Sequence, residues 1–365
     1  MEISSEYQVI AVQNIVNVMW FKNLMGFREK SPQQVRENIL LEPEQSQLKS
    51  LVNSKNMTCG VLETPTLKQL RERIQNLNYV SGANTVGEII ANVQNLHTDI
   101  KNQRSLFQVA SQFNLLEMVS PRVTPEDGVD IYEADRTQGP ACAIACGAGT
   151  IYRNYFADVN GKIGQSVNNQ IDCLGDLGRA LGNEDDRLWR MKNGYALANH
   201  RGLIEISQRL DSCNESELDE LRQLLRVGIQ WQTQVTIDRC EHLVSQIYCS
   251  ALPVAYSPIP ASTWKNFAQL ILEASYEATI CTAILNSVNN GNNNLYLTLL
   301  GGGAFGNDIN WIMKAIERSL NLYRNANLNI YIVSYSRSNS HVQQLISSLE
   351  KNEGRGTKDE GKNLR

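Results

Sequence analysis

The sequence lacks the features that nucleic-acid-binding, membrane and secreted proteins usually need. Its 365 residues carry a formal net charge of −4, so no basic surplus is available to neutralise a phosphate backbone, and we expect no nucleic-acid partner. Apolar runs are short and interrupted, well below the roughly 18 residues of a membrane-spanning helix, so we expect no membrane association. Residues 1–7 include two glutamates and no basic segment, which is unlike a secretory signal.

Patterns of metal ligands are also missing. The eight cysteines are scattered, and none forms a CxxC pair. Cys142 and Cys146 are four residues apart, but no second pair or nearby histidine completes a zinc site. The four histidines are dispersed, which favours structural positions over catalytic ones. We therefore expect buried free thiols in a reducing, cytoplasmic compartment, and neither a metal nor a cofactor.

What the sequence does contain is an alternation of helical and strand patterns, with 42% apolar residues to build a core. Apolar residues at three- and four-residue spacing predict helices at 10–27, 32–41, 67–77, 86–96, 215–225, 264–286 and 308–320. Apolar or alternating runs predict a buried strand that runs into a loop at 106–120, and strands at 228–237, 243–256, 295–300 and 328–336. Strands that alternate with helices predict an α/β fold around a largely buried central sheet.

The same patterns suggest a division of the chain into regions. Residues 1–100 are predicted to be a helical N-terminal region, which serves either to recognise a partner or to buttress the sheet. Residues 101–345 are predicted to be the α/β domain, with a looser helical insertion at about 157–226. Residues 351–365 are charged and contain glycine, and we expect them to be a disordered tail.

A glycine-rich loop stands between the predicted strand 295–300 and the helix that follows. Glycines let the backbone approach a phosphate closely, the helix offers free N–H groups, and Asn307 or Asp308 can cap that helix. We therefore predict that the loop binds a diphosphate; its residues are Gly301, Gly302, Gly303, Ala304, Phe305, Gly306 and Asn307. A dinucleotide-dehydrogenase site is disfavoured because the next strand ends without a carboxylate, and no Gly-Lys-Ser/Thr follows as in a Walker A motif.

A second cluster of candidate functional residues lies in the acidic loop, residues 121–139. It has five carboxylates within ten residues: Glu126, Asp127, Asp130, Glu133 and Asp135. Such a loop can simply be solvated, but this one follows a buried strand and precedes the small-residue segment 140–155. Thr137, Gln138 and Gly139 add neutral donors beside the acids. Loops at strand ends are where α/β folds place catalytic groups, so we predict a catalytic role.

Together, "VASQFNLLE" at 109–117 and "LLGGGAFGND" at 299–308 resemble the macrodomain superfamily, and within it the hydrolases related to poly(ADP-ribose) glycohydrolase. The acidic loop is similar to the aspartate-rich catalytic loop of MavL-like bacterial-effector hydrolases, which remove ADP-ribose from ubiquitin. The resemblance implies a central mixed sheet flanked by helices. Two departures stand out: the family's Asn-Ala-Ala-Asn segment reads Ser-Gln-Phe-Asn at 111–114, and its tandem glutamates are missing. Both favour the release of single ADP-ribose units.

The resemblance also implies roles for individual residues. The diphosphate of ADP-ribose would lie on the glycine loop, and Gln112 and Asn114 would bind ribose hydroxyls. Asp127 and Asp135 are the first choices for catalysis, with Asp130 third. The partner would be an ADP-ribosylated protein, by analogy ubiquitin, in a cytoplasm that a bacterial effector has entered. A reader that binds ADP-ribose without cleaving it, and a nucleotide or nucleoside hydrolase, remain alternatives, and the linkage atom is left open.

Overall fold

The computed structural model describes residues 19–360. Its α-helices are α1 Trp20–Met25, α2 Pro32–Asn38, α3 Leu67–Gln75, α4 Val93–Thr98, α5 Gln138–Ala145, α6 Gly147–Tyr155, α7 Gly175–Leu181, α8 His200–Ser212, α9 Glu215–Arg222, α10 Ala261–Asn290, α11 Ile309–Leu322 and α12 Ser340–Glu360. Its strands are β1 Ile39–Glu42, β2 Gln47–Ser50, β3 Asn56–Thr58, β4 Val61–Glu63, β5 Thr85–Ile90, β6 Leu106–Ala110, β7 Asp158–Val159, β8 Lys162–Ile163, β9 Trp189–Lys192, β10 Tyr195–Ala198, β11 Gly228–Gln234, β12 Leu243–Cys249, β13 Asn294–Leu297 and β14 Asn329–Ser334.

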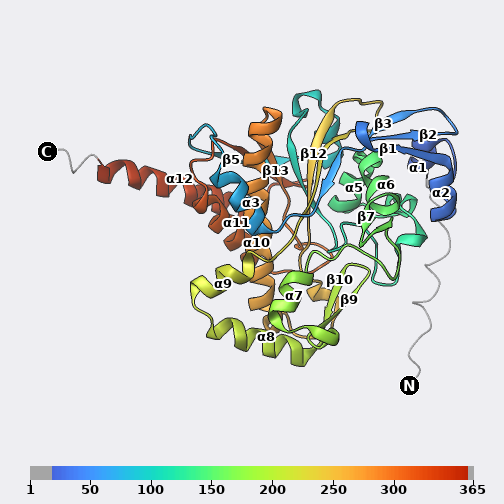
Figure 1. Ribbon diagram of the computed structural model, residues 1–365. Helices are drawn as coiled ribbons and strands as arrows, with labels where there is room; N and C mark the ends of the chain where they lie inside the picture. The colour runs from blue at the N-terminus through green and yellow to red at the C-terminus, as the bar shows by residue number, and fades with distance from the viewer. Residues whose placement is uncertain (1–18, 361–365) are drawn as a thin grey trace, which may run out of the picture.

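A seven-stranded sheet in the order β4-β11-β12-β6-β13-β14-β5 forms the centre of the molecule. Strands β12, β6, β13, β14 and β5 run parallel, whereas β11 is antiparallel to both β12 and β4. Helices α3, α10 and α11 lie on one side of the sheet, and α5 and α6 lie on the other (Figure 1). The predicted α/β class, with a central mixed sheet flanked by helices, is confirmed.

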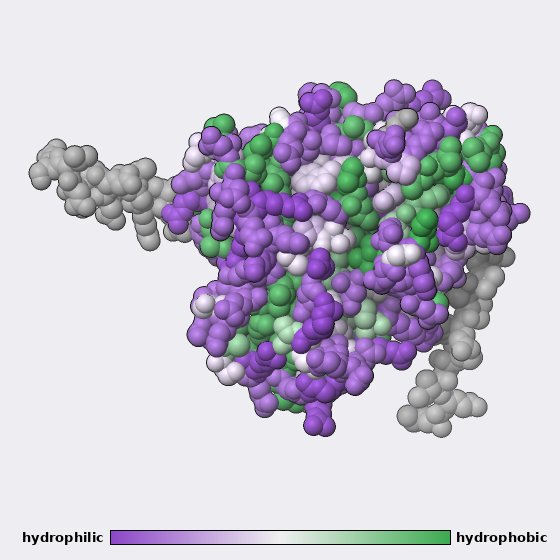
Figure 2. All heavy atoms as spheres, in the orientation of Figure 1, coloured by the Kyte–Doolittle hydropathy of each residue, from purple (hydrophilic) through white to green (hydrophobic). Residues whose placement is uncertain are grey.

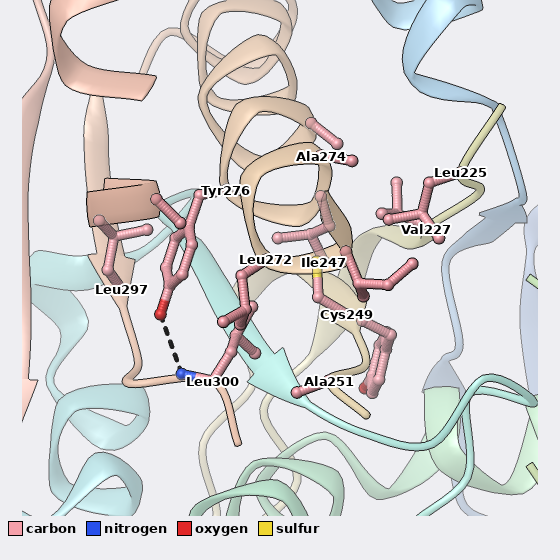
Figure 3. Packing of buried hydrophobic residues seen from close by; sticks show 14 of the residues in the cluster. Leu225, Val227, Ile247, Cys249, Ala251, Leu272, Ala274, Tyr276, Leu297 and Leu300 are labelled. Carbon is pink, nitrogen blue, oxygen red and sulfur yellow. Dashed lines mark hydrogen bonds between the residues drawn. The ribbon is translucent and has the colours of Figure 1, made fainter. Parts of the chain in front are cut away.

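The main core lies between this sheet and the long helix α10. Strand β6 is buried along nearly its whole length, as expected for a parallel strand covered on both faces. Residues of α10 pack against the ends of β12 and β13 in Figure 3. There the Tyr276 hydroxyl donates to the Thr298 carbonyl (2.7 Å) and accepts from the Leu300 N–H (2.9 Å). Helix α10 therefore fixes the chain directly before the glycine loop.

The prediction of a helical N-terminal region was wrong in several places. Residues 86–96, predicted as one helix, form strand β5 and the short helix α4. Val86, Ile89 and Ile90 have helical spacing, but pairing with β14 outweighs this local preference. The predicted helix 32–41 ends at Asn38, β1 begins at the next residue, and β1, β2 and β3 form a separate small sheet. Part of the predicted helix 10–27 lies outside the described residues.

Two further regional predictions need correction. The insertion at 157–226 contains the hairpins β7–β8 and β9–β10 beside α7, α8 and α9, so it is only partly helical. The predicted disordered tail is helical as far as Glu360, because α12 continues through it, and 361–365 lie outside the described residues. In Figure 1, α12 projects away from the body of the molecule.

The surface and the thiols agree with the composition. The face in Figure 2 is mainly hydrophilic, with hydrophobic residues in separate groups. Within residues 19–360 no helix combines the length and the apolar character needed to cross a bilayer. All eight cysteines are free thiols and six of them are buried, which confirms the prediction of buried free thiols for those six.

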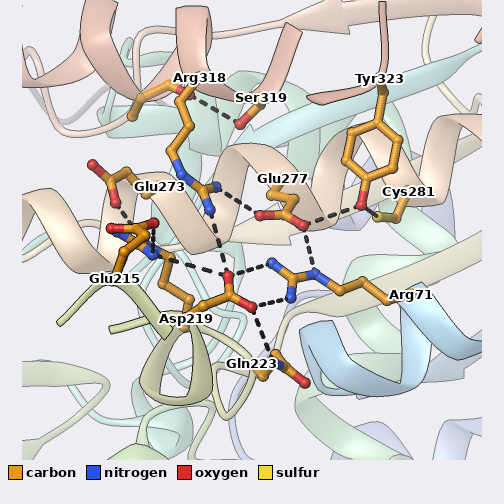
Figure 4. A network of polar contacts seen from close by, with 12 residues as sticks. Arg71, Glu215, Asp219, Gln223, Glu273, Glu277, Cys281, Arg318, Ser319 and Tyr323 are labelled. Carbon is orange, nitrogen blue, oxygen red and sulfur yellow. Dashed lines mark hydrogen bonds and ion pairs between the residues drawn. The ribbon is translucent and has the colours of Figure 1, made fainter. Parts of the chain in front are cut away.

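Charged side chains tie α3, α9, α10 and α11 together on the outer side of the sheet (Figure 4). The Glu277 carboxylate, only 1% exposed, binds Arg71 (2.6 Å) and Arg318 (2.7 Å). Asp219 forms a second bridge to Arg71, at 2.6 Å. The two arginines hold the pKa of Glu277 below its usual value although burial alone would raise it. The network is therefore a structural joint between helices.

Removing the central carboxylate of this joint is expected to destabilise the fold. Glu277→Ala leaves Arg71 and Arg318 with Asp219 as their one remaining shared carboxylate, and the loss of a buried partner typically costs about 3 kcal/mol of unfolding free energy. Urea unfolding followed by circular dichroism measures the change. Arg187→Ala, which breaks the exposed Arg187–Glu205 pair, is the control and should leave the midpoint unchanged. Equal midpoints for the two variants would contradict the structural role of Glu277.

Candidate functional site

Two adjoining cavities open at the carboxyl ends of the parallel strands. The small cavity, about 160 Å³, lies at the ends of β6, β12 and β13. The large cavity, about 1120 Å³, lies at the ends of β13, β14 and β5. They share five lining residues: Asp135, Thr137, Gln138, Thr298 and Leu299. Open α/β sheets bind ligands at this edge, so the two cavities form one candidate site.

The glycine loop is held in its shape by two glycines with positive φ. Gly301 has φ +71° and Gly306 has φ +69°, and a Cβ on Gly301 would lie 2.5 Å from the Ala251 Cβ. Asn307 closes the loop: its N–H donates to the Gly301 carbonyl (2.9 Å) and its side-chain amide donates to the Leu252 carbonyl (2.8 Å). Asp308 caps α11, as predicted, by accepting from the Asn310 N–H at 2.7 Å.

The tip of the loop presents free hydrogen-bond donors. Gly303, Ala304 and Phe305 line the small cavity, and their N–H groups donate to no acceptor within residues 19–360. A Cβ placed on Gly303 would meet nothing within 4 Å. Successive free N–H groups in a turn before a helix form a typical anion site. Gly302, Gly306 and Asn307 shape the loop and do not line the cavity.

The acidic loop faces these donors through its last residues. Asp135 lines both cavities, and its Oδ1 accepts from the Thr137 N–H at 2.8 Å. Thr137, Gln138 and Gly139 line the small cavity at the start of α5. The Gln138 amide fastens this helix to β6 by accepting from the Ala110 N–H (3.0 Å) and donating to the Gln108 carbonyl (2.9 Å).

Glu117 is the site residue that the sequence prediction missed. It lines the small cavity, its side chain is buried, and its Oε1 has no hydrogen-bond partner within the described chain. A Cβ on Gly139 would lie 2.3 Å from Glu117 Oε2, so only glycine permits this approach. Burial raises the pKa of Glu117 well above its usual value, with a smaller contribution from Asp135 and an opposing one from Arg153. Burial therefore favours the protonated form of Glu117.

A signal for Glu117 was present in the sequence. It is the only charged residue in the run "FNLLEMV" at 113–119, directly after a buried strand. A single carboxylate among apolar neighbours indicates a buried acid, and buried acids with raised pKa values concentrate at functional sites.

Two of the predicted catalytic aspartates lie elsewhere. Asp127 is exposed, and its Oδ2 accepts from the Thr124 N–H (2.8 Å) in a capping box. The Asp130 carboxyl lies beside Glu29, and neither aspartate lines the small or the large cavity. The loop makes the separate 3₁₀ turns η3 Pro125–Asp127 and η4 Asp130–Ala134, which turn its carboxylates in different directions. Of the three aspartates, the site brings in Asp135.

The two predicted ribose ligands also differ in placement. Gln112 lines the small cavity, and its Oε1 accepts from the Met118 N–H at 2.8 Å. Asn114 is fully buried, donates to Gln170 Oε1 (2.8 Å) and accepts from the Leu116 N–H (3.2 Å). Asn114 therefore shapes the segment that carries Glu117, and only Gln112 reaches the cavity.

Three aromatic rings form one wall of the small cavity. Tyr195 from β10, Tyr256 from η6 Val254–Tyr256 and Phe305 from the glycine loop have ring centroids 5.2 to 5.5 Å apart. The Tyr195 hydroxyl donates to the Met118 carbonyl at 2.5 Å. The insertion thus contributes a residue to the site, and Tyr195 and Tyr256 were not predicted from the sequence.

The burial of the Glu29 carboxyl beside Asp130 predicts a pH dependence of stability. Burial raises the pKa of Glu29 from 4.5 to about 7. A carboxyl whose folded-state pKa is raised stabilises the protein fully below its unfolded-state pKa, and this contribution is lost as pH rises through the folded-state pKa. The unfolding free energy should therefore fall between pH 4.5 and 7. Urea titrations across this range should show a shallower fall for Glu29→Gln, and an identical profile would contradict the assignment.

No protein-family model and no curated protein matches the chain. Among solved structures, it is similar to poly(ADP-ribose) glycohydrolase from Deinococcus radiodurans in complex with ADP-ribose, at 10% identity over 79% of this chain and 94% of that chain, with a TM-score of 0.44. It is also similar to the enzyme from Thermomonospora curvata bound to the inhibitor ADP-HPD, at 8% identity over 87% and 95% of the two chains, with a TM-score of 0.43. Both are members of the family that the sequence motifs resemble.

Proposed function

We propose that the chain is an ADP-ribosyl hydrolase that releases single ADP-ribose units from a modified protein. One observation carries the proposal: a buried acid, Glu117, and Asp135 line the same cavity as the free N–H groups of the glycine loop. Donors for a diphosphate and carboxyl groups for glycosidic chemistry therefore lie within reach of one ligand.

The glycine loop and the two cavities define one orientation for bound ADP-ribose. Its diphosphate accepts from the N–H groups of Gly303, Ala304 and Phe305, which line the small cavity. Its terminal ribose occupies the small cavity, since a cavity of roughly 150 Å³ holds one ring-sized ligand. Its adenosine lies in the large cavity, over the ends of β14 and β5.

The reaction is the hydrolysis of the bond between the anomeric carbon of the terminal ribose and an atom of the modified side chain. As that bond breaks, positive charge develops on the ribose, and Glu117, in the protonated form that its burial favours, gives its proton to the departing atom. Asp135 orients a water and accepts its proton while the water oxygen bonds to the anomeric carbon. The products are free ADP-ribose and the unmodified side chain.

The burial of Glu117 favours hydrolysis over simple binding. A buried carboxyl without a hydrogen-bond partner costs stability, and a diphosphate needs no carboxyl group for its recognition. A site that only bound the diphosphate would therefore not need Glu117. The same residue in an acid–base role accounts for both its burial and its raised pKa.

Two measurements test the proposal. Calorimetry with ADP-ribose tests binding, and incubation with peptides or ubiquitin carrying ADP-ribose on arginine, glutamate or serine tests its release. Binding with release from at least one linkage is the expected result. Binding without release from any substrate would indicate a reader, and no heat at millimolar ADP-ribose would overturn the proposal. Release from free nucleotides alone would indicate a nucleotide hydrolase.

A further inference from the structure

The N-terminal segment 19–29 holds the acidic loop beside the large cavity, which Trp20 and Glu133 line. The centre of this contact is the half-buried Glu29 carboxyl, whose Oε2 accepts from the Val129 N–H (2.8 Å) and the Asp130 N–H (2.7 Å). Its Oε1 is hydrogen-bonded to the Tyr155 hydroxyl of α6. Gly128 has φ +93°, and a Cβ there would lie 2.4 Å from Glu29 Oε2. The loop backbone is therefore shaped around this one side chain.

In a second set of contacts, the loop supplies the carboxylate and the N-terminal segment supplies the backbone N–H groups. The Glu133 carboxylate of the loop accepts from the Met19 N–H (2.6 Å) and the Trp20 N–H (3.1 Å) at the start of α1. The Trp20 indole N–H donates to the Val129 carbonyl at 3.2 Å. Residues 129–133 are thus fastened to the N-terminal segment at both ends of η4.

These anchors are connected to both proposed catalytic groups. Asp135 follows η4 directly, and its N–H donates to the Tyr132 carbonyl at 3.1 Å. The Tyr132 hydroxyl, fully buried, accepts from the Glu117 N–H at 3.0 Å. A shift of η4 would therefore displace Asp135 and Glu117 together.

We propose that Glu29 is a positioning residue for hydrolysis, which keeps Asp135 and Glu117 in place through the backbone of residues 129–132. The proposal rests on the proposed function. A carboxyl group that accepts two backbone N–H groups is a strong and directional anchor. The groups that face Glu29 are Asp130 on η4, Tyr155 on α6 and, at longer range, Tyr132. Asp130, predicted from the sequence as catalytic, then belongs to the anchor.

The test compares Glu29→Ala, Glu29→Gln and Glu37→Ala. Glu37 is an exposed residue of α2 that contacts Gln33, so its variant is the control. We expect Glu29→Ala to lower kcat by about 10- to 100-fold, because displacements of about 1 Å have effects of this size. The affinity for ADP-ribose should change less than about threefold, since the glycine loop is untouched. Glu29→Gln keeps an acceptor for the two N–H groups and should retain most of the activity.

Hydrogen exchange gives a readout that does not depend on activity. The amides of Val129 and Asp130 should exchange faster in Glu29→Ala than in wild type, while those of β6 stay protected. Unchanged kcat, or equal losses of kcat and affinity, would overturn the proposal. If wild type neither binds ADP-ribose nor releases it, the proposed function fails, and unchanged exchange at Val129 and Asp130 would then refute the anchor separately.

Discussion

Glu117→Gln is expected to lower the rate of ADP-ribose release by about 10³-fold, the usual contribution of a positioned general acid. The amide has the shape of the protonated carboxyl and still donates a hydrogen bond, but it has no proton to give to the departing atom. Binding should change little, because the diphosphate donors of the glycine loop are unaffected. Single-turnover release from a mono-ADP-ribosylated substrate, beside calorimetry with ADP-ribose, measures both quantities.

A matched pair of aspartate variants sharpens this test. Asp135 lines both cavities, whereas Asp127 is exposed and caps the Thr124 N–H. Asp135→Asn should therefore lose activity strongly, and Asp127→Asn should stay within about twofold of wild type. The reverse order would mean that the acidic loop adopts another arrangement during catalysis. An active Glu117→Gln enzyme would remove Glu117 from the reaction.

Local sequence patterns were sufficient to predict some helices and strands but not others. The strand, glycine loop and helix at 294–322 were predicted because each signal is local: an apolar run, consecutive glycines and a capping aspartate. Residues 86–96 were mispredicted because their helical spacing competes with pairing to β14, which begins more than 230 residues later. The small sheet β1-β2-β3 was missed for a similar reason, since its short strands have no strong alternation.

The candidate site, like the fold, was only partly predictable from the sequence. The order of residues in the acidic loop gave no indication that Glu29, about 100 residues earlier, shapes its backbone. From the sequence, Asp127 therefore ranked with Asp135 and Asp130 came third, although of the three only Asp135 lines the two cavities. Tyr195 belongs to the site only because a hairpin of the insertion folds over it. Contacts distant in sequence, and not residue types, select the members of this site.

The glycine loop leads to the second large effect. Gly301→Ala is expected to weaken ADP-ribose binding by at least about 100-fold, the equivalent of losing two charge-assisted hydrogen bonds to the diphosphate. The new Cβ would lie 2.5 Å from both the Ala251 Cβ and the Asn307 Nδ2. Asn307 would have to break its hydrogen bond to the Leu252 carbonyl. The free N–H groups of the loop tip would then no longer all point toward the diphosphate.

Gly291→Ala provides the matched control for backbone strain. Gly291 ends α10 with φ +70°, nearly the value of Gly301, but a Cβ there meets nothing within 4 Å. Both variants carry the cost of a positive φ, so both should unfold at a somewhat lower temperature than wild type. Only Gly301→Ala should lose affinity for ADP-ribose in calorimetry. If a folded Gly301→Ala protein binds as tightly as Gly291→Ala, the diphosphate does not bind at the glycine loop, and the ligand direction proposed for the two cavities is wrong.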